Sequence, residues 1–264
     1  LLLLGGFLLS RGMESTGAHK RVALGVIRLV GSDSPRRLVL GFMIAGAVLS
    51  MWISNTATVL MLLPVALAVL DSAEQKERLA APLLLGLAWS CSIGGLGTPI
   101  GTPPNLIFMQ VYEDTTGLTI GFTQWMSWGL PIVVTLIALA ALWLTRSLPE
   151  KLKVTLPDAV AWRSAEKRVL MIFGITAFLW MTRAGPFGGW RELLGVPIAN
   201  DASVAFLAVI VLFISRDDEG APLITWQEAA SIPWAVLLSF AGGICLASAF
   251  AASGLSALAG EALV

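Results

Sequence analysis

Apolar positions along this chain form runs that suit transmembrane helices, because about 20 apolar residues are needed to cross a bilayer. Polar loops separate the runs near residues 71–78, 113–120, 146–167, 184–201 and 215–230. The predicted spans are residues 1–9, as the end of a span, and the runs 121–145, 169–182, 202–214 and 232–251. Residues 18–30 alternate basic and apolar positions at helical spacing, which predicts a helix in the membrane interface, and we expect another at 252–264.

The apolar run 38–70 has the wrong length for one span and for two. A straight helix of this length would reach roughly 50 Å, against a bilayer core of about 30 Å. Two full spans and a turn would need more residues. The length therefore predicts a re-entrant hairpin, with half-helices 38–53 and 57–70 that meet inside the membrane at Ser54, Asn55 and Thr56.

A second apolar run, residues 79–112, is interrupted by the segment "SIGGLGTPIGTPPN". Helix 79–93 leads into the Gly/Pro-rich residues 94–102, and another helical piece begins near Pro103. Proline is tolerated in a first helical turn, where its missing N–H would have no helical partner. The pattern predicts a broken transmembrane helix.

The composition agrees with this pattern. Hydrophobic residues make up 56% of the 264 residues and charged residues 13%, and the mean hydropathy is +0.82. These values indicate an all-α polytopic membrane protein. A formal net charge of zero gives no sign of a nucleic-acid partner. Cys91 and Cys245 both lie in apolar runs, which favours packing over a disulfide.

The basic residues predict an orientation. If 38–70 is re-entrant and the spans alternate, fifteen Lys and Arg fall on one side and only Arg183 and Arg191 on the other. Basic residues concentrate on the cytoplasmic side of membrane proteins. We therefore expect a multi-pass protein of a cell or bacterial inner membrane whose hairpin enters from the cytoplasm.

Two segments of the chain resemble each other. At an offset of 237 residues, Gly5 and Gly6 align with Gly242 and Gly243, and four predicted spans separate the copies. The copies would then cross the membrane in opposite directions, as in inverted-repeat transporters. A second hairpin is expected 237 residues after Ser54, beyond Val264, so that the chain would begin inside one repeat and end inside the next.

The helix breaks also suggest a chemistry. Non-helical backbone at membrane depth is tolerated where it lines a cavity or is buried in protein. A half-helix that starts near Thr56 presents N–H groups and a positive dipole end, which suit an anion. The half-helix that ends near Ile53 presents carbonyls, which suit a hard cation. Ser50, Ser54, Asn55 and the segment 94–102, with Thr98 and Thr102, add further oxygen atoms, and a neutral oxygen cage fits Na⁺.

The placement of acidic residues favours sodium over protons as the coupling ion. All 17 Asp and Glu fall in loops or near the ends of predicted spans, and the one histidine, His19, lies in the interfacial helix. Proton-coupled carriers usually place a carboxylate or histidine within the membrane.

The motifs "SMWISNTAT" and "SIGGLGTPIGTPPN" together resemble the divalent anion:sodium symporter family, whose members carry succinate, malate, fumarate, citrate or sulfate. The resemblance covers essentially the whole chain. It implies a sodium-coupled carrier of small divalent anions and not an enzyme, with Na⁺ as co-transported ion, no organic cofactor, contact with membrane lipid, and a homodimer that works by an elevator motion. It also implies a transport domain at 38–145, with scaffold at 1–37 and mainly at 146–264.

The same resemblance assigns site residues. The substrate set is Ser54, Asn55, Thr56 and Thr102. The sodium set is Ser50, Ser54, Asn55, Gly95, Gly97, Thr98, Gly101 and Asn105. Asn105 could instead be a helix cap, and Ser50 could simply bond to a neighbouring helix. His19, Lys20 and Arg21 are interpreted as a solvated, lipid-facing charge cluster.

Three other classes of function bear on the same sequence pattern. A related anion exchanger or ion antiporter could use the same hairpin architecture. A channel would conduct without saturable exchange. An intramembrane enzyme is disfavoured, because no Ser/His or Asp/Asp pair and no His/Glu metal motif lies at membrane depth.

Overall fold

The computed structural model describes residues 1–31, 33–149, 161–183 and 189–254. Within these ranges the regular structure is helical, apart from an isolated β-bridge between Arg216 and Pro222. Its elements are α1 (Leu2–Thr16), α2 (Ala18–Val30), α3 (Pro35–Ser50), α4 (Asn55–Asp71), α5 (Lys76–Gly94), the 3₁₀ turn η1 (Gly95–Gly97), α6 (Pro103–Thr116), α7 (Phe122–Thr145), α8 (Ser164–Thr182), α9 (Gly189–Leu193), α10 (Asp201–Ile214), α11 (Trp226–Ala230) and α12 (Trp234–Ala252). The all-α prediction is confirmed.

The two half-helices expected in 38–70 are present as α3 and α4. Ser34 caps α3 by accepting a hydrogen bond from the Arg37 N–H at 3.3 Å, with Pro35 in the first helical turn. Ser54 caps α4 in the same way, through the Ala57 N–H at 3.2 Å. Between them the chain turns at residues 51–54, and the observed helix ends differ from the predicted ones by one to three residues.

The broken helix is also present. α5 continues through η1, the chain becomes extended at Thr98, and α6 starts at Pro103. Gly94 lies against the backbone of α3: a Cβ there would meet the Ala47 carbonyl oxygen at 2.4 Å. The Trp125 indole N–H of α7 donates to the Leu96 carbonyl at 2.9 Å. These contacts seat the break against the hairpin turn on one side and α7 on the other.

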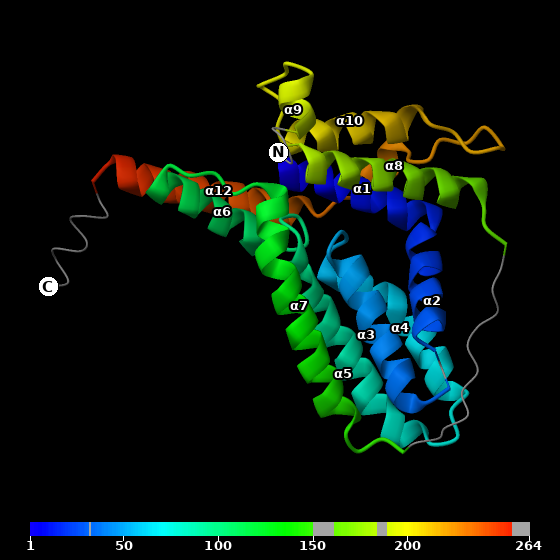
Figure 1. The fold of residues 1–264 in the computed structure, drawn as a ribbon. Helices are drawn as coiled ribbons and strands as arrows, with labels where there is room; N and C mark the ends of the chain where they lie inside the picture. The colour runs from blue at the N-terminus through cyan, green and yellow to red at the C-terminus, as the bar shows by residue number, and fades with distance from the viewer. Residues whose placement is uncertain (32, 150–160, 184–188, 255–264) are drawn as a thin grey trace, which may run out of the picture.

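The helices pack into two groups that meet near the helix breaks (Figure 1). One contains α3, α4, α5 and α7, and the other contains α1, α8 and α10. Helix α2 leaves α1 at Gly17, which has a φ of +79°, and packs along α3. Close to the hairpin turn, Trp52 joins the groups by stacking edge-on against Phe173 of α8, with ring centroids 5.1 Å apart. The assignment of these groups to transport and scaffold domains stays a prediction.

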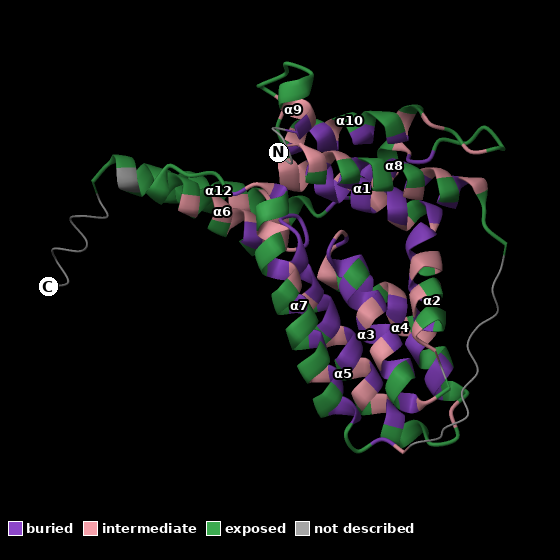
Figure 2. Ribbon diagram, viewed as in Figure 1, coloured by how far each residue is buried: buried purple, intermediate pink, exposed green. Residues whose placement is uncertain are grey.

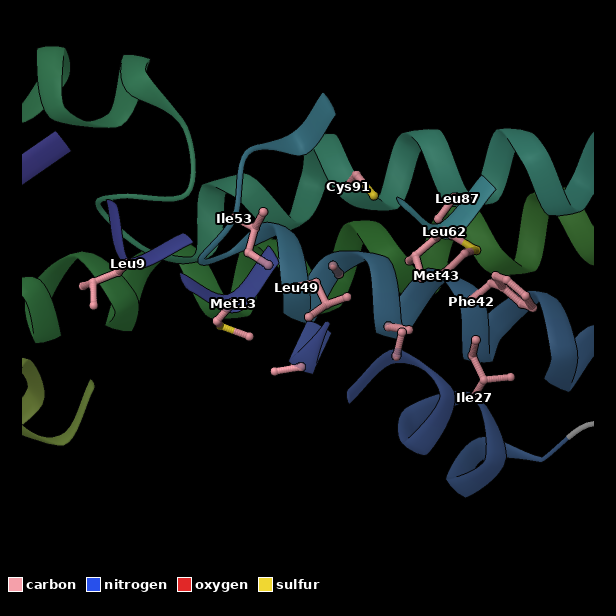
Figure 3. Packing of buried hydrophobic residues seen from close by; sticks show 14 of the residues in the cluster. Leu9, Met13, Ile27, Phe42, Met43, Leu49, Ile53, Leu62, Leu87 and Cys91 are labelled. Atoms are coloured by element: carbon pink, nitrogen blue, oxygen red, sulfur yellow. The ribbon is translucent and has the colours of Figure 1, made fainter. Parts of the chain in front are cut away.

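The buried core follows α3 (Figures 2 and 3). Phe42, Met43 and Leu49 of α3 lie with Leu62 of α4 and Leu87 of α5 in this cluster. The outer faces of α7 and α12 are exposed and apolar. Among the residues that the structure describes, two helices are long and apolar enough to cross a membrane by themselves, Lys76–Gly97 and Phe122–Thr145. Such exposed apolar surfaces suit a lipid environment.

The structure corrects the interpretation of the basic segment at the start of α2. His19 is buried, with 2% of its surface exposed, and its Nδ1–H donates to the Met13 carbonyl at 2.8 Å. Arg21 pairs with the buried Glu166 of α8 at 3.0 Å. Only Lys20 is exposed as expected. For Arg21 the error arose because its partner is 145 residues away in the chain, and for His19 because the turn at Gly17 brings the ring back to the Met13 carbonyl of α1. The second predicted interfacial helix, 252–264, lies mostly outside the described residues.

Candidate functional site

The turn between α3 and α4 and the break before α6 border one cavity of about 490 Å³. Among its lining residues are Ser54, Asn55, Thr56, Gly101, Thr102 and Pro103. The four residues predicted for the substrate are all in this set. The cavity therefore joins the two motifs that the sequence singled out.

The positive end of α4 opens on this cavity. The Ser54 hydroxyl accepts a hydrogen bond from the Ala57 N–H, and the Ser54 carbonyl accepts one from the Thr58 N–H. The backbone N–H groups of Asn55 and Thr56 have no acceptor in the described part of the chain. Free N–H groups in a first helical turn, together with the helix dipole, favour an anion. Thr102, the N-cap residue of α6, does not use its side chain as a cap.

Oxygen atoms gather directly behind this wall. The Ser50 hydroxyl donates to Asn55 Oδ1 at 2.6 Å, and Ser50 is fully buried. Gly95 lies so close that a Cβ there would meet Asn55 Oδ1 at 2.7 Å. The absence of a side chain at Gly95 thus lets the broken helix approach the hairpin turn. These contacts bring Ser50, Asn55 and Gly95 together, and their role as sodium ligands stays a prediction.

Asn105 and Thr98 brace the oxygen cluster. The Asn105 side-chain amide donates to the carbonyls of Gly95 and Thr98, both at 2.8 Å. The Thr98 hydroxyl, which is fully buried, donates to the Met51 carbonyl. Gly97 lies against the Met51 side chain, and a Cβ at Gly101 would meet the Gly95 carbonyl oxygen at 2.5 Å. Asn105 therefore acts as a clamp, because its amide nitrogen fixes the positions of two carbonyl groups. Each of these carbonyl oxygens keeps a second lone pair that can accept another partner.

Part of the cavity wall was not predicted from the sequence. Ser10, Arg11 and Glu14 of α1 line the same space as the hairpin turn. The predicted span stopped at residue 9, whereas α1 continues to Thr16 and carries these polar residues into the packed protein. Their i,i+3 and i,i+4 spacing, which suits side-chain pairing on a helix, was the available signal.

The described residues contain no group of three or more His, Cys, Asp and Glu that could hold a metal ion. The oxygen atoms that gather at the hairpin turn and the helix break are hydroxyl, amide and carbonyl oxygens. Such neutral oxygen ligands suit hard cations.

Comparison with known proteins gives the family. The profile of the citrate transporter family, CitMHS, matches residues 1–264. Among curated proteins, the chain is 34% identical over 286 residues to the sodium-dependent dicarboxylate transporter SdcS of Staphylococcus saprophyticus, covering 99% of this chain and 54% of that protein. It is 35% identical, with the same coverage, to the transporter of that name from Staphylococcus aureus strain USA300.

The chain thus spans about half the length of the curated relatives it matches. These relatives are transporters, which agrees with the resemblance drawn from the two motifs. The match along the whole of the present sequence, together with its apolar helices, makes this chain an integral membrane protein that belongs to the citrate transporter family.

Proposed function

We propose that this chain forms an ion and substrate site of a sodium-coupled carrier for small dicarboxylates such as succinate, malate or fumarate. One observation carries the proposal: the hairpin turn and the broken helix converge on one cavity, with free N–H donors on its wall and a buried oxygen cluster behind it. The dicarboxylate transporters at 34% and 35% identity support this choice of substrate.

The substrate carboxylate would lie at the start of α4. The N–H groups of Asn55 and Thr56 would donate to it, and the hydroxyls of Ser54, Thr56 and Thr102 lie on residues of the same wall. Charge-assisted hydrogen bonds of this kind are about twice as strong as neutral ones. The helix dipole adds a favourable term because the ligand is negative.

The sodium ion would lie among the oxygens behind that wall. The proposed ligands are Ser50, Ser54 and Asn55 through their side chains and the glycine-rich break through its carbonyls, at Gly95, Gly97, Thr98 and Gly101. Asn55 would serve both ligands, with its side-chain oxygen on the cation and its backbone N–H on the carboxylate. Each ligand would then raise the affinity for the other, and the coupling is reciprocal.

For the transport cycle we propose an elevator motion. In it, the group of α3, α4, α5 and α7 moves against the group of α1, α8 and α10, within an inverted-repeat homodimer whose hairpin enters from the cytoplasm. The division of the packing into two groups that meet at the aromatic contact of Trp52 supports this proposal.

The test is uptake by proteoliposomes. The protein is expressed from its own gene, with any flanking sequence that the gene encodes, and reconstituted. An inward sodium gradient should drive accumulation of labelled succinate, and replacing sodium by choline should abolish it. Unlabelled malate and fumarate should compete, while citrate and sulfate test the width of the selectivity. Uptake that is independent of sodium would overturn the proposal, and uptake that needs only an internal anion would identify an exchanger.

A further inference from the structure

A cluster of aromatic rings joins the hairpin turn and the start of α7 to α8. The Trp52 ring lies edge-on to Phe173 with centroids 5.1 Å apart, and nearly parallel to Trp180 with centroids 6.3 Å apart. Phe122 of α7 stacks on both tryptophans, with centroids 6.1 Å from Trp52 and 5.0 Å from Trp180. The cluster therefore spans the two packing groups, with two rings from each.

The two tryptophans of this cluster are held in different ways. Trp180 is 1% exposed, and its indole N–H donates to the Asp201 carbonyl of α10 at 2.9 Å, which fixes the ring to the group of α1, α8 and α10. The Trp52 indole N–H has no acceptor among the described residues. A ring contact without a hydrogen bond can open without leaving a buried donor unpaired. The contact of Trp52 with α8 is therefore one that can be released.

Trp52 is tied to the group that carries the candidate site. It lies in the turn at residues 51–54, which borders the cavity. Its backbone N–H donates to the Leu49 carbonyl of α3 at 3.0 Å, and the neighbouring Met51 carbonyl accepts the Thr98 hydroxyl of the helix break. Because these bonds hold the turn to α3 and to the break, the ring cannot stay on α8 when the cavity moves with its own group.

We propose that Trp52 is a latch, whose ring docks the substrate-binding group on α8 in the described state and leaves α8 when the cavity is carried across the membrane. This inference rests on the proposed transport cycle. One aromatic pair changes an equilibrium constant by roughly two- to ten-fold, and Trp52 makes two such pairs with α8. Trp52 is not among the described residues that line the cavity, so the latch acts on the motion and not on ligand binding.

A cross-link between the two groups can detect the docked state. Beside the rings, the Thr123 hydroxyl of α7 donates to the Met181 carbonyl of α8 at 2.9 Å, and both residues are exposed. In a Cys245→Ser background, Thr123→Cys and Met181→Cys should react together with a short reducible bis-methanethiosulfonate. This cross-link should block sodium-driven uptake, and reduction should restore it. The control pair is Phe213→Cys and Trp226→Cys, whose native rings lie 6.2 Å apart between α10 and α11, and its cross-link should leave uptake unchanged.

The latch predicts slower cross-linking of Thr123→Cys to Met181→Cys when its rings are removed. Trp52→Ala should lower the rate several-fold, and Trp52→Phe, which keeps a ring, should lower it less. Phe173→Ala changes only α8, and it should act in the same direction without adding to Trp52→Ala. Sodium should still raise the unfolding midpoint of Trp52→Ala, whereas a purely structural role in the turn would abolish this rise and leave Phe173→Ala without effect.

The experiment is cross-linking of the reconstituted protein, with succinate uptake measured in the same proteoliposomes. Slower cross-linking in both Trp52→Ala and Phe173→Ala supports the latch. An unchanged rate in Phe173→Ala, or a cross-linked protein that still accumulates succinate, overturns it, and Phe173→Ala decides the matter even if Trp52→Ala does not fold. An unsubstituted protein without sodium-dependent uptake would overturn the proposed function, while the cross-linking rates, which need no substrate, would still decide the latch.

Discussion

The side-chain amide of Asn105 has an oxygen that could bind a cation and a nitrogen that can donate hydrogen bonds. As a sodium ligand it would offer its oxygen to the cation, whereas in the structure its nitrogen donates to the carbonyls of Gly95 and Thr98. The donor role predicts that Asn105→Asp is damaging, because a carboxylate would face two carbonyl oxygens. Loss of two buried hydrogen bonds costs on the order of 1–3 kcal/mol each. Thermal unfolding in detergent should show a lower midpoint, and sodium-stimulated uptake should be lost.

A matched control for this substitution lies at Asn200. Its side chain caps α10 by accepting the Ser203 N–H at 3.0 Å, and aspartate is an equally good cap. Asn200→Asp should therefore leave both the unfolding midpoint and the uptake unchanged. If Asn105→Asp instead bound sodium more tightly than the unsubstituted protein, Asn105 would be a ligand and the clamp would be wrong.

His19 predicts a pH dependence of stability. Burial lowers the pKa of the His19 imidazole below its ordinary value of 6.5; the Met13 carbonyl opposes this shift, Lys20 adds to it and Glu14 opposes it. The folded state then binds fewer protons than the unfolded state, so stability is complete above about pH 6.5 and falls as the pH decreases further. Nε2 is buried and has no hydrogen-bond partner among the described residues, so a proton there would be costly.

The measurement for His19 is the unfolding midpoint in detergent at about pH 7.5 and about pH 5.5. The unsubstituted protein should lose more stability between these values than His19→Gln, which cannot titrate in this range. Equal losses in the two proteins would show that His19 does not contribute to the acid sensitivity.

At the scale of the elements, local signals located the two breaks, and the helix predicted to begin near Pro103 begins at that residue. The half-helices begin earlier than predicted, at Pro35 and Asn55, because Ser34 and Ser54 cap them, and capping acts within one turn of the chain. The contacts that α1 and α2 make could not be predicted in this way. Arg21 meets Glu166 from a position 145 residues away, and Arg11 reaches the cavity because α1 extends beyond the apolar run. The pairing of Arg21 with Glu166 has no local sequence signal, whereas the helical spacing of Arg11 and Glu14 was one for the longer α1.

The close approach of α3 and α5 gives a prediction at this scale. Gly94→Ala should push the helices apart, because its Cβ would lie 2.4 Å from the Ala47 carbonyl oxygen and 2.5 Å from Ala47 Cα. The backbone cannot move aside as a flexible side chain does. The free energy of unfolding should therefore fall by at least the roughly 1–3 kcal/mol typical of overpacking. Circular dichroism melts should show a clearly lower midpoint.

Gly25→Ala is the control for this substitution. Gly25 is exposed within α2 and has no atoms within 4 Å of the added methyl group. Alanine is preferred to glycine in a helix by about 1 kcal/mol, so this variant should be as stable as the unsubstituted protein or more so. A Gly94→Ala variant with the stability of Gly25→Ala would contradict the described packing of α3 on α5.

At the scale of the whole molecule, the orientation stays a prediction that labelling can check. α7 separates Thr116 from Ser147, and both residues are exposed. In a Cys245→Ser background, which removes the exposed native thiol, an impermeant maleimide should label Ser147→Cys only from the cytoplasmic side and Thr116→Cys only from outside. Labelling of both from one face would be incompatible with α7 as a single span.

The proposed coupling of sodium to substrate requires one site shared by cation and anion, and Asn55 is the residue that joins them. Its Oδ1 accepts the Ser50 hydroxyl at 2.6 Å, and its residue lines the cavity. The most direct test is therefore the sodium activation curve of succinate uptake in Asn55→Ala, with Asn200→Ala as the matched control outside the cavity. Losing one buried ligand, at about 1–3 kcal/mol, should raise the half-activating sodium concentration roughly ten-fold or more. An unchanged sodium activation curve in Asn55→Ala would contradict the account.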